Sequence, residues 1–383
     1  MKTERTLWTG AQIYDTERVC FCPGSLLVRD GLVEAVLPPM QTTQIDAQTR
    51  QANGCLLVPG LVDVHTHGRL GFDFCDATAE QMRQMRRSYA LDGTTTLLPT
   101  IASAPFAQML QAVQRVQEAG FDGVHIEGRY LSPIRRGAHA PQLLCLPQPA
   151  EAELLLDAAH GGAFHLTLAP ELPGAAETIR AVCRRGGSCG IGHSDASYEQ
   201  ALQALDWGCT AFTHLYNCMP PLHHRAPGCA GAALSTDAFC EIISDGFHLH
   251  PGMVRMTQRC KQAQKLVLIT DSMSATGCPD GEYAIAGISV TVKDGKALNA
   301  EGHIAGSTIS LWTGLRRFMQ FCELSLEQAL PYATSNPARM VGLQNCCGAL
   351  RAGLRADFLV LQKEQKGLDF SIASVWARGQ RIE

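Results

Sequence analysis

Two histidines, His65 and His67, stand two positions apart at the end of a short apolar run within the sequence Pro-Gly-Leu-Val-Asp-Val-His-Thr-His-Gly. The run has the length and composition of a β-strand, and side chains two residues apart on a strand point to the same face. Both imidazoles can therefore reach one cation, and histidine is the commonest metal ligand in proteins. An isolated pair of this kind is more often a polar strand end, so a metal site requires further ligands elsewhere.

Four more residues of ligand type stand at the ends of later apolar runs. Each of them alone has an ordinary explanation, since an aspartate after a strand is commonly a helix cap. The same coincidence at five strands of one sheet is improbable, and we interpret the set as a metal site. Histidines with carboxylates suit Zn²⁺, Fe²⁺ or Mn²⁺ better than Mg²⁺ or Ca²⁺. These residues are Glu127, His193, His214 and Asp271.

The elements that must position these residues alternate between short apolar strands and segments of helical length, which is typical of a parallel sheet built from βα units. In a (β/α)₈ barrel the active site lies at the carboxyl ends of the strands, where the ligand-type residues fall. We predict eight strands at 61–67, 94–101, 123–127, 165–171, 189–195, 211–217, 239–245 and 266–271.

Local signals mark several of the connecting helices. Thr78 and Gln81 have the spacing of a capping box, which predicts a helix over 78–91. Helices over 106–119, 175–185 and 197–207 each run into a glycine, a common helix stop. An apolar helix is expected over 311–324, and another begins at residues 335–337 with Pro337 in its first turn.

Both ends of the chain are rich in predicted strands and carry no residue of catalytic type. Asp30-Gly31 lies between apolar runs at 24–29 and 32–37, a strong signal for a two-residue hairpin. The tail has strand-like segments at 356–361 and 374–380. The fold prediction is a (β/α)₈ TIM-type barrel over 58–345, with a small accessory β-domain built from residues 1–57 and 346–383. The segment 283–305 is partly β in character and contains no motif that we can interpret.

Composition limits the function. The net charge of −4 argues against nucleic acid or an acidic membrane surface as the main partner. There is no apolar stretch of about 20 residues that could span a membrane, and the first eight residues lack the apolar run of a signal peptide. The 16 cysteines are scattered through apolar segments, so we interpret them as reduced thiols of a cytoplasmic protein.

The distribution of lysine excludes one mechanism and disfavours another. After Lys2 the next lysine is Lys261, so no carboxylated lysine can bridge two metals at the fourth strand. A Schiff-base mechanism is disfavoured for the same reason. The natural bridging carboxylate is Glu127.

The complete set of motifs resembles the N-acetylglucosamine-6-phosphate deacetylase family of the amidohydrolase superfamily, over nearly the whole chain. No single motif is specific, but their combination and order are. The motifs are His125-Ile-Glu-Gly, Gly137-Ala-His139, Thr167-Leu-Ala-Pro-Glu171, Gly192-His-Ser-Asp195, Thr213-His-Leu-Tyr-Asn217-Cys-Met-Pro, His224-Arg-Ala-Pro-Gly228, Ser244-Asp-Gly-Phe-His248, Thr270-Asp271, Ala305-Gly-Ser307 and Asn336-Pro-Ala-Arg.

The resemblance implies metal-dependent hydrolysis of the N-acetyl group of an amino-sugar phosphate, with one or two divalent cations per subunit, Zn²⁺ before Fe²⁺ or Mn²⁺. Glu127, His193 and His214 would form the principal metal site. His65 and His67, which only some members possess, would hold a second metal bridged by Glu127. Asp271, near the metals, would act as general base and then acid.

The resemblance also implies the remaining roles. His139 or His248 would stabilise the developing oxyanion. In relatives the arginine at position 225 reaches across a dimer interface, so the resemblance implies a homodimer. The residues expected to contact the sugar phosphate are His139, Asn217, Cys218, His224, Arg225, His248 and Ser307.

Three departures from the family pattern put the exact substrate in doubt: Arg129 replaces a usual proline, Cys218 an alanine and Ala226 a glutamate. Arg129 could add a phosphate contact or mark a different acylated sugar, such as N-acetylgalactosamine 6-phosphate. Hydrolases of N-acyl amino acids or cyclic amides are a second alternative, although they lack the motifs around Asn217 and Arg225. A catalytically inactive barrel that serves as a scaffold is a third, disfavoured because the ligand set is complete.

Overall fold

The computed structural model describes residues 5–39, 45–363 and 370–383. The other residues fall in the segments expected to form the accessory domain, and they lie outside this description. The chain divides into two compact units. One, the terminal unit, comprises Met1–Val62, Arg86–Thr96 and Leu324–Glu383; the other, the barrel unit, comprises Asp63–Met85 and Leu97–Glu323. The domain limits expected from the sequence stay a prediction.

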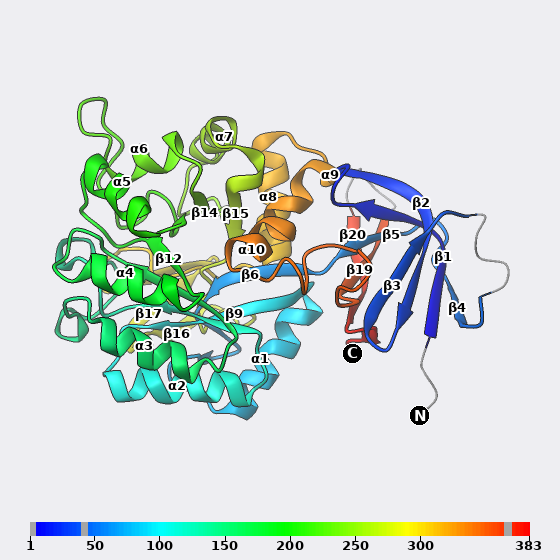
Figure 1. The fold of residues 1–383 in the computed structure, drawn as a ribbon, viewed down its shortest axis with the longest axis horizontal. Coiled ribbons are helices and arrows are strands. Elements are labelled where there is room, and N and C mark those ends of the chain that lie inside the picture. Colours follow the sequence, from blue (N-terminus) through cyan, green and yellow to red (C-terminus); the bar gives the residue numbers. More distant parts are fainter. Residues whose placement is uncertain (1–4, 40–44, 364–369) are drawn as a thin grey trace. The chain divides into compact units, whose positions relative to one another are not determined.

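The predicted barrel is confirmed. Its eight strands follow the order β6-β9-β10-β11-β12-β13-β14-β15, and Figure 1 shows helices outside them. A parallel bridge between Thr66 and Ser272, beside a hydrogen bond from the Asp271 N–H to the His65 carbonyl (2.9 Å), brings the two edge strands together, so the barrel is nearly closed. The strands are β6 Leu61–Thr66, β9 Thr94–Ala102, β10 Gly123–Glu127, β11 Ala163–Leu168, β12 Ser188–Ile191, β13 Ala211–Phe212, β14 Phe239–Ile243 and β15 Leu266–Ile269.

The five helices predicted for this part are present, with ends within two residues of those expected. The Thr78 hydroxyl accepts from the Gln81 N–H (3.2 Å) while the Gln81 side chain accepts from the Thr78 N–H (2.8 Å), as a capping box requires. The helices are α1 Ala79–Leu91, α2 Phe106–Glu118, α3 Pro149–Ala158, α4 Ala175–Arg184, α5 Tyr198–Trp207, α6 Gly228–Ser235, α7 Pro251–Cys260 and α8 Leu311–Cys322, with 3₁₀ turns at Pro133–Arg135, Pro141–Leu143 and Ala263–Lys265.

Several strands end before the predicted limits. The strand expected over 211–217 ends at Phe212, and that expected over 189–195 ends at Ile191. The reason is that the ligand-type residues just beyond leave the extended conformation: φ is +47° at His193, +28° at His214 and +49° at Asp271. The sequence pattern marks where the chain turns toward the site but not the backbone conformation of that turn.

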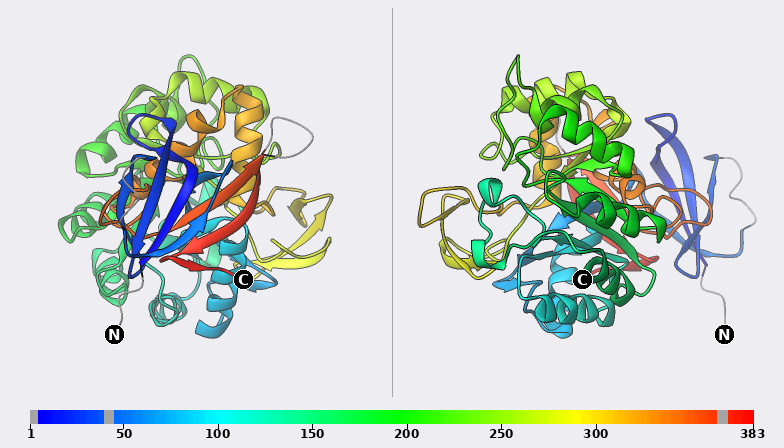
Figure 2. Two further views of the ribbon diagram at one scale, coloured as in Figure 1. Left: turned by 90° about the vertical axis from the view of Figure 1, so that its right-hand side faces the viewer. Right: turned by 60° about the vertical axis from the view of Figure 1, so that its left-hand side comes forward.

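Most of the segment 283–305 belongs to an antiparallel sheet of three strands, β16 Gly281–Ile285, β17 Ile288–Lys293 and β18 Lys296–Asn299. It has a small core of its own, formed by Ile285, Val290, Val292 and Ala297 with Met273, Ala275 and Ala305. In both views of Figure 2 this yellow sheet stands at the edge of the molecule. A shorter ribbon, β7 Gly68–Arg69 with β8 Phe72–Asp73, follows the first barrel strand.

The terminal unit holds a mixed sheet made from both ends of the chain, as predicted. Its strands follow the order β21-β20-β19-β5-β1-β2-β3, with β4 beside β1, and Figure 1 shows the blue and red strands side by side. Asp30 and Gly31, both with positive φ, form the predicted hairpin turn. The strands are β1 Arg5–Asp15, β2 Cys20–Arg29, β3 Leu32–Leu37, β4 Gln48–Gln51, β5 Leu56–Pro59, β19 Phe358–Lys363, β20 Phe370–Ala377 and β21 Gln380–Arg381; the helices are α9 Leu326–Ala329 and α10 Ser335–Met340, with a 3₁₀ turn at Leu330–Ala333.

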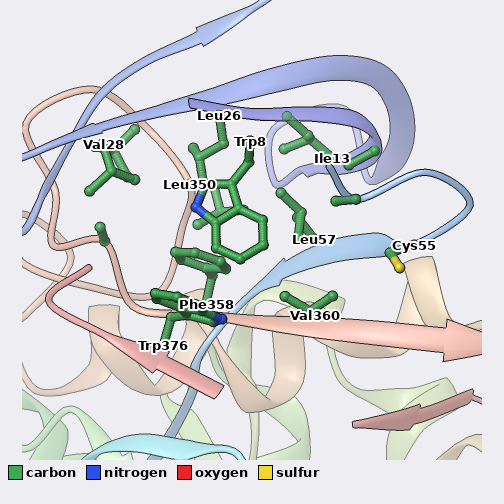
Figure 3. Packing of buried hydrophobic residues seen from close by; sticks show 14 residues of the cluster. Trp8, Ile13, Leu26, Val28, Cys55, Leu57, Leu350, Phe358, Val360 and Trp376 are labelled. Atoms are coloured by element: carbon green, nitrogen blue, oxygen red, sulfur yellow. The ribbon is translucent and has the colours of Figure 1, made fainter. Parts of the chain in front are cut away.

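Aromatic packing joins the two ends of the chain within this unit. The Trp8 ring meets those of Phe358 and Trp376 edge-on at 5.3 and 4.8 Å between centroids, among Leu26, Leu57 and other buried residues (Figure 3). Strand β1 therefore shares one hydrophobic core with β19 and β20 from the other end of the chain.

No helix within the described residues has the length and apolar character needed to cross a membrane. All 16 cysteines are free thiols, as predicted, and half of them are buried.

Candidate active site

The Glu127 carboxylate, at the end of β10, is surrounded by five histidines, four at the carboxyl ends of barrel strands and one, His139, in the connection between β10 and α3. The Nε2 atoms of five imidazoles approach its two oxygens: His214 at 2.9 Å, His67 at 3.0 Å, His193 at 3.2 Å, His65 at 3.3 Å and His139 at 3.7 Å. The Asp271 carboxylate closes the cluster, 3.2 Å from His67 and 3.5 Å from His65. The predicted ligands from five strands thus converge at one point.

The backbone pays a conformational cost to make this cluster. His193, His214 and Asp271 all lie two residues beyond their strands in the left-handed region, which residues other than glycine rarely adopt. Strain of this kind costs of order 1–3 kcal/mol per residue and collects at functional sites. Its presence at three of the residues around Glu127 favours a functional interpretation of the cluster.

Hydrogen bonds fix the tautomers of two of these histidines. His65 Nδ1 donates to the Glu241 carboxylate (3.1 Å), and His193 Nδ1 donates to the Arg135 carbonyl (3.0 Å). Because a carboxylate and a carbonyl can only accept, the proton of each neutral ring lies on Nδ1. The Nε2 lone pairs of both rings therefore point into the cluster, as metal ligation requires.

The cluster attracts positive charge. Burial lowers the pKa of His67, but its hydrogen bonds to Asp271 and Glu127 outweigh burial and raise that pKa to about 9. Burial raises the pKa of the Asp271 carboxyl, yet the hydrogen bond from His67 and the charge of His65 hold it at about 2. The same balance, with the charge of His65 as the largest opposing cause, keeps the pKa of Glu127 well below its usual value. A bound cation would supply the charge that the two carboxylates favour.

The donor set fits a divalent cation. The Nε2 atoms of His193 and His214 lie 3.0 Å apart, and His65 Nε2 is buried with no hydrogen-bond partner among the described residues. One carboxylate cannot satisfy so many converging nitrogens, whereas a metal ion accepts several lone pairs at once. Two groups of atoms are close enough for one ion each, His65 with His67 and Glu127, and Glu127 with His139 and His193. The cluster therefore suggests a site for two metals that share Glu127.

His139 differs from the other histidines of the cluster. Its Nδ1 lies 3.4 Å from the Ser103 backbone N–H, which can only donate, so the ring proton belongs on Nε2. Burial lowers the pKa of His139 to about 4, so the ring is neutral. It presents an N–H group rather than a lone pair to the cluster, so His214, whose Nε2 lies 2.9 Å from Glu127 and 3.0 Å from His193 Nε2, suits the second group better as a ligand.

A cavity of about 420 Å³ opens over the cluster. Most of the predicted site residues line it: His67, Glu127, His139, His193, His214, Asn217, Cys218, His248 and Asp271. The His248 ring is held by the Asp245 carboxylate, 2.7 Å from its Nδ1. Ile285 and Lys296 from the three-stranded sheet, with His303 from the loop after it, complete the wall.

Four of the predicted site residues do not line the cavity that this chain forms by itself. His65 is buried beneath the wall, while His224 and Arg225 are exposed on the loop before α6. Ser307 is buried and donates its hydroxyl to the Thr270 carbonyl (2.5 Å), although the preceding residues 305 and 306 line the cavity.

The Arg129 guanidinium is held by neighbouring side chains, away from the cavity. Its guanidinium pairs with Glu151 at 3.0 Å and lies 5.8 Å from the centroid of the Phe106 ring, outside the cavity wall formed by the described residues. Cys218, by contrast, lines the cavity.

Sequence reasoning missed two parts of the site. Glu241 supports His65 from within β14, and its signal was a single charge inside the otherwise apolar run Phe-Cys-Glu-Ile-Ile. The wall contributed by the three-stranded sheet had no such signal, because the strand that ends in Ile285 alternates between exposed and less exposed residues as in any half-exposed strand.

The sequence matches known proteins over nearly its whole length. Residues 56–382 match the Amidohydrolase family. The chain is 36% identical over 335 residues to N-acetylglucosamine-6-phosphate deacetylase from Vibrio furnissii, which covers 85% of this chain and 82% of the relative. It is 33% identical over 365 residues to N-acetylgalactosamine-6-phosphate deacetylase from Escherichia coli O157:H7, covering 93% of each.

A solved structure has the same fold. The structure of a mutant N-acetyl-D-glucosamine-6-phosphate deacetylase from Mycobacterium smegmatis, in complex with N-acetyl-D-glucosamine 6-phosphate, superposes with a TM-score of 0.89 at 32% identity and covers 100% of both chains.

Proposed function

This chain belongs to the amidohydrolase family and, within it, to the N-acetylglucosamine-6-phosphate deacetylases, and we propose that it hydrolyses the acetamide of N-acetylglucosamine 6-phosphate to glucosamine 6-phosphate and acetate. The observation that carries the proposal is the convergence of five imidazoles on Glu127 at the floor of a cavity. The reaction belongs to amino-sugar catabolism.

The cofactor we propose is Zn²⁺, with Fe²⁺ or Mn²⁺ as alternatives. Glu127, His193 and His214 would hold one ion, and His65 and His67 with Glu127 a second; the Asp271 carboxylate lies beside His65 and His67. When bound, such an ion supplies Lewis-acid chemistry, polarising a carbonyl and lowering the pKa of water. The rest of the mechanism is assigned to side chains of this chain.

Asp271 is the proposed proton carrier. Its carboxylate is ionised and lines the cavity, so it can take the proton of an attacking water and then deliver it to the departing amine. His139 is proposed to donate its Nε2–H to the oxygen of the tetrahedral intermediate, because it is neutral and presents that hydrogen to the cavity. His248 could share this role, held in place by Asp245.

The sugar phosphate is proposed to lie against Asn217, Cys218 and His248, with Ser307 behind the opposite wall. His224 and Arg225 are exposed and outside the cavity wall of their own chain, which supports a homodimer in which they reach the partner's site. A guanidinium matches a phosphate bidentately and would position the sugar for reaction. We further place the enzyme in the cytoplasm, since its 16 free thiols suit a reducing compartment.

The specific alternative is N-acetylgalactosamine 6-phosphate, on which a 33% identical relative is named to act. The test is kcat/KM for acetate release from N-acetylglucosamine 6-phosphate, its galactosamine epimer and unphosphorylated N-acetylglucosamine. We expect the first to be the best substrate and the third the poorest. A preference for the epimer would support the alternative, and no release from any of the three would contradict the proposal.

A further inference from the structure

We infer that Glu241 is a positioning residue of the metal centre, which holds His65 in the tautomer and orientation of a metal ligand and couples it to the strand that carries His214. The inference rests on the proposed metal-dependent function and extends it to a residue outside the cavity wall. No family motif found in the sequence includes Glu241.

The geometry places Glu241 directly behind the ligands. It lies on β14, between β13, which leads to His214, and β15, which leads to Asp271. Its side chain is fully buried, and Oε2 lies 3.1 Å from His65 Nδ1 and 3.2 Å from the backbone nitrogen of His214. One oxygen therefore contacts a ligand of each of the two proposed metal sites.

Glu241 is not placed to bind a metal itself. Its contact is with Nδ1 of His65, whereas the opposite nitrogen, Nε2, faces Glu127 and Asp271. It is absent from both groups of described residues that could surround one ion. A ring nitrogen that donates to a carboxylate makes the other nitrogen a stronger electron donor, which is the usual arrangement behind a metal-bound histidine.

A purely structural role explains the residue poorly. A buried carboxylate is costly unless it is paired, and among the described residues Glu241 has no lysine or arginine partner. Its Oε1 atom has no hydrogen-bond partner at all among them. A neutral residue could pack in the barrel at lower cost. A cation on the far side of the His65 ring offsets the buried charge, and this accounts for a glutamate at this position.

The experiment compares Glu241→Gln, Glu241→Ala and His65→Gln with wild type by metal analysis after dialysis and by titration of metal-free protein with Zn²⁺. Cys240→Ala is the matched control. Cys240 precedes Glu241 on β14, and among the described residues its thiol bonds to the Ala233 carbonyl and not to a proposed metal ligand. Circular dichroism and thermal unfolding of each metal-free variant report whether the barrel folds.

Wild type is expected to bind two ions per chain. Loss of an outer-shell partner typically weakens metal binding about 10–100-fold, so Glu241→Ala should lose one ion on dialysis. Glu241→Gln, which keeps an acceptor for His65 and the His214 N–H but loses the charge, should lie between Glu241→Ala and wild type. In a His65→Gln background, Glu241→Ala should cause little further loss, because its effect acts through His65. Cys240→Ala should match wild type.

Three results would overturn the inference: Zn²⁺ affinity and stoichiometry unchanged in folded Glu241→Ala, a full additional loss in the double variant, or a wild type that binds one ion only. Acetate release is measured separately on the same samples. If Glu241→Ala loses metal as expected while wild type releases no acetate, the positioning role stands and the proposed function fails. Recovery of acetate release by Glu241→Ala at high Zn²⁺ would support both.

Discussion

The histidines inside this barrel divide into two kinds, according to what lies beside them. His65 and His67 face carboxylates, which offset burial and raise the pKa of both rings, and His193 lies 3.2 Å from the Glu127 carboxylate. His125 and His165 lie deeper, bonded to hydroxyl groups of Thr100, Thr167 and Ser188. The first kind can hold a metal, whereas the second fills the barrel as neutral polar rings.

His165 makes the stability of the protein depend on pH. Burial lowers its pKa from 6.5 to about 4, so on acidification the unfolded chain takes up a proton that the folded chain refuses. The stability is present above the unfolded pKa and is lost as the pH falls from about 6.5 toward 4. Between pH 7 and pH 5 this single group should remove about 2 kcal/mol from the free energy of unfolding.

Urea unfolding of wild type and His165→Gln at both pH values measures this effect. Between pH 7 and pH 5, the free energy of unfolding of His165→Gln should fall by about 2 kcal/mol less than that of wild type. The control is His303→Gln, in which an imidazole with an exposed fraction of 73% is removed; it should behave as wild type. Equal pH dependence in all three proteins would show that His165 is not the group responsible.

At the scale of single residues, the ligand-type residues around Glu127 could be predicted from the sequence. The residue that supports them from behind, Glu241, could not. Glu127, His193, His214 and Asp271 could be found because each follows an apolar strand, and parallel strands bring their carboxyl ends together. Glu241 lies within a strand, where only its neighbours in space explain its charge. The pairing of Arg129 with Glu151, from a helix 22 residues later, could not be predicted, because the two side chains meet only in the folded chain.

At the end of β12 a glycine leaves room for polar side chains inside the barrel. Gly192 follows β12 and precedes His193. A methyl group in its place would meet side-chain atoms of Thr167 and Thr213 at 2.7 Å, and both residues are buried within the barrel. The ligand His193 can therefore keep its position only if residue 192 has no side chain.

Gly192→Ala is expected to lower the free energy of unfolding by about 1–3 kcal/mol through overpacking. It should also lower kcat/KM for deacetylation, because His193 must move with the backbone. Thermal unfolding and acetate release would measure the two effects. Gly281→Ala is the control, since its added methyl would meet only Tyr283 at an ordinary 3.6 Å. Unchanged activity in Gly192→Ala would contradict this account of the strand end.

Elements with local signals could be predicted from the sequence. The capping box at Thr78, the glycine stop at Gly208 and the Asp30-Gly31 turn act within a few residues, and each lies where it was expected. The strand ends could not be predicted, because the left-handed backbone at His193 and His214 depends on the convergence of the whole site. The role of the 283–305 segment likewise depends on where the barrel places it.

At the scale of the whole molecule, the proposed homodimer requires that each active site borrow Arg225 from the partner. Chains carrying Asp271→Asn and chains carrying Arg225→Ala should each be poorly active at low concentrations of substrate. In a mixed dimer, the Arg225→Ala chain keeps its own Asp271 and receives an intact arginine from its partner. One of its two sites should therefore regain wild-type kcat/KM.

The mixture is tested by unfolding and refolding the two variants together and isolating mixed dimers with two different affinity tags. Acetate release by the mixed dimers should exceed that of either variant alone. Mixed dimers without such recovery would show that Arg225 acts within its own chain, and a monomer in solution would exclude the shared site.

The measurement that tests the central claim most directly is acetate release from N-acetylglucosamine 6-phosphate as Zn²⁺ is titrated into metal-free enzyme, for wild type and Asp271→Asn together. The rate of acetate release by wild type should rise as metal binds. It should stop rising when the metal sites that share Glu127 are filled. Asp271→Asn should bind metal yet release no acetate above background, because it lacks the proton carrier. Full activity in metal-free wild type, or wild-type turnover by Asp271→Asn, would contradict the account.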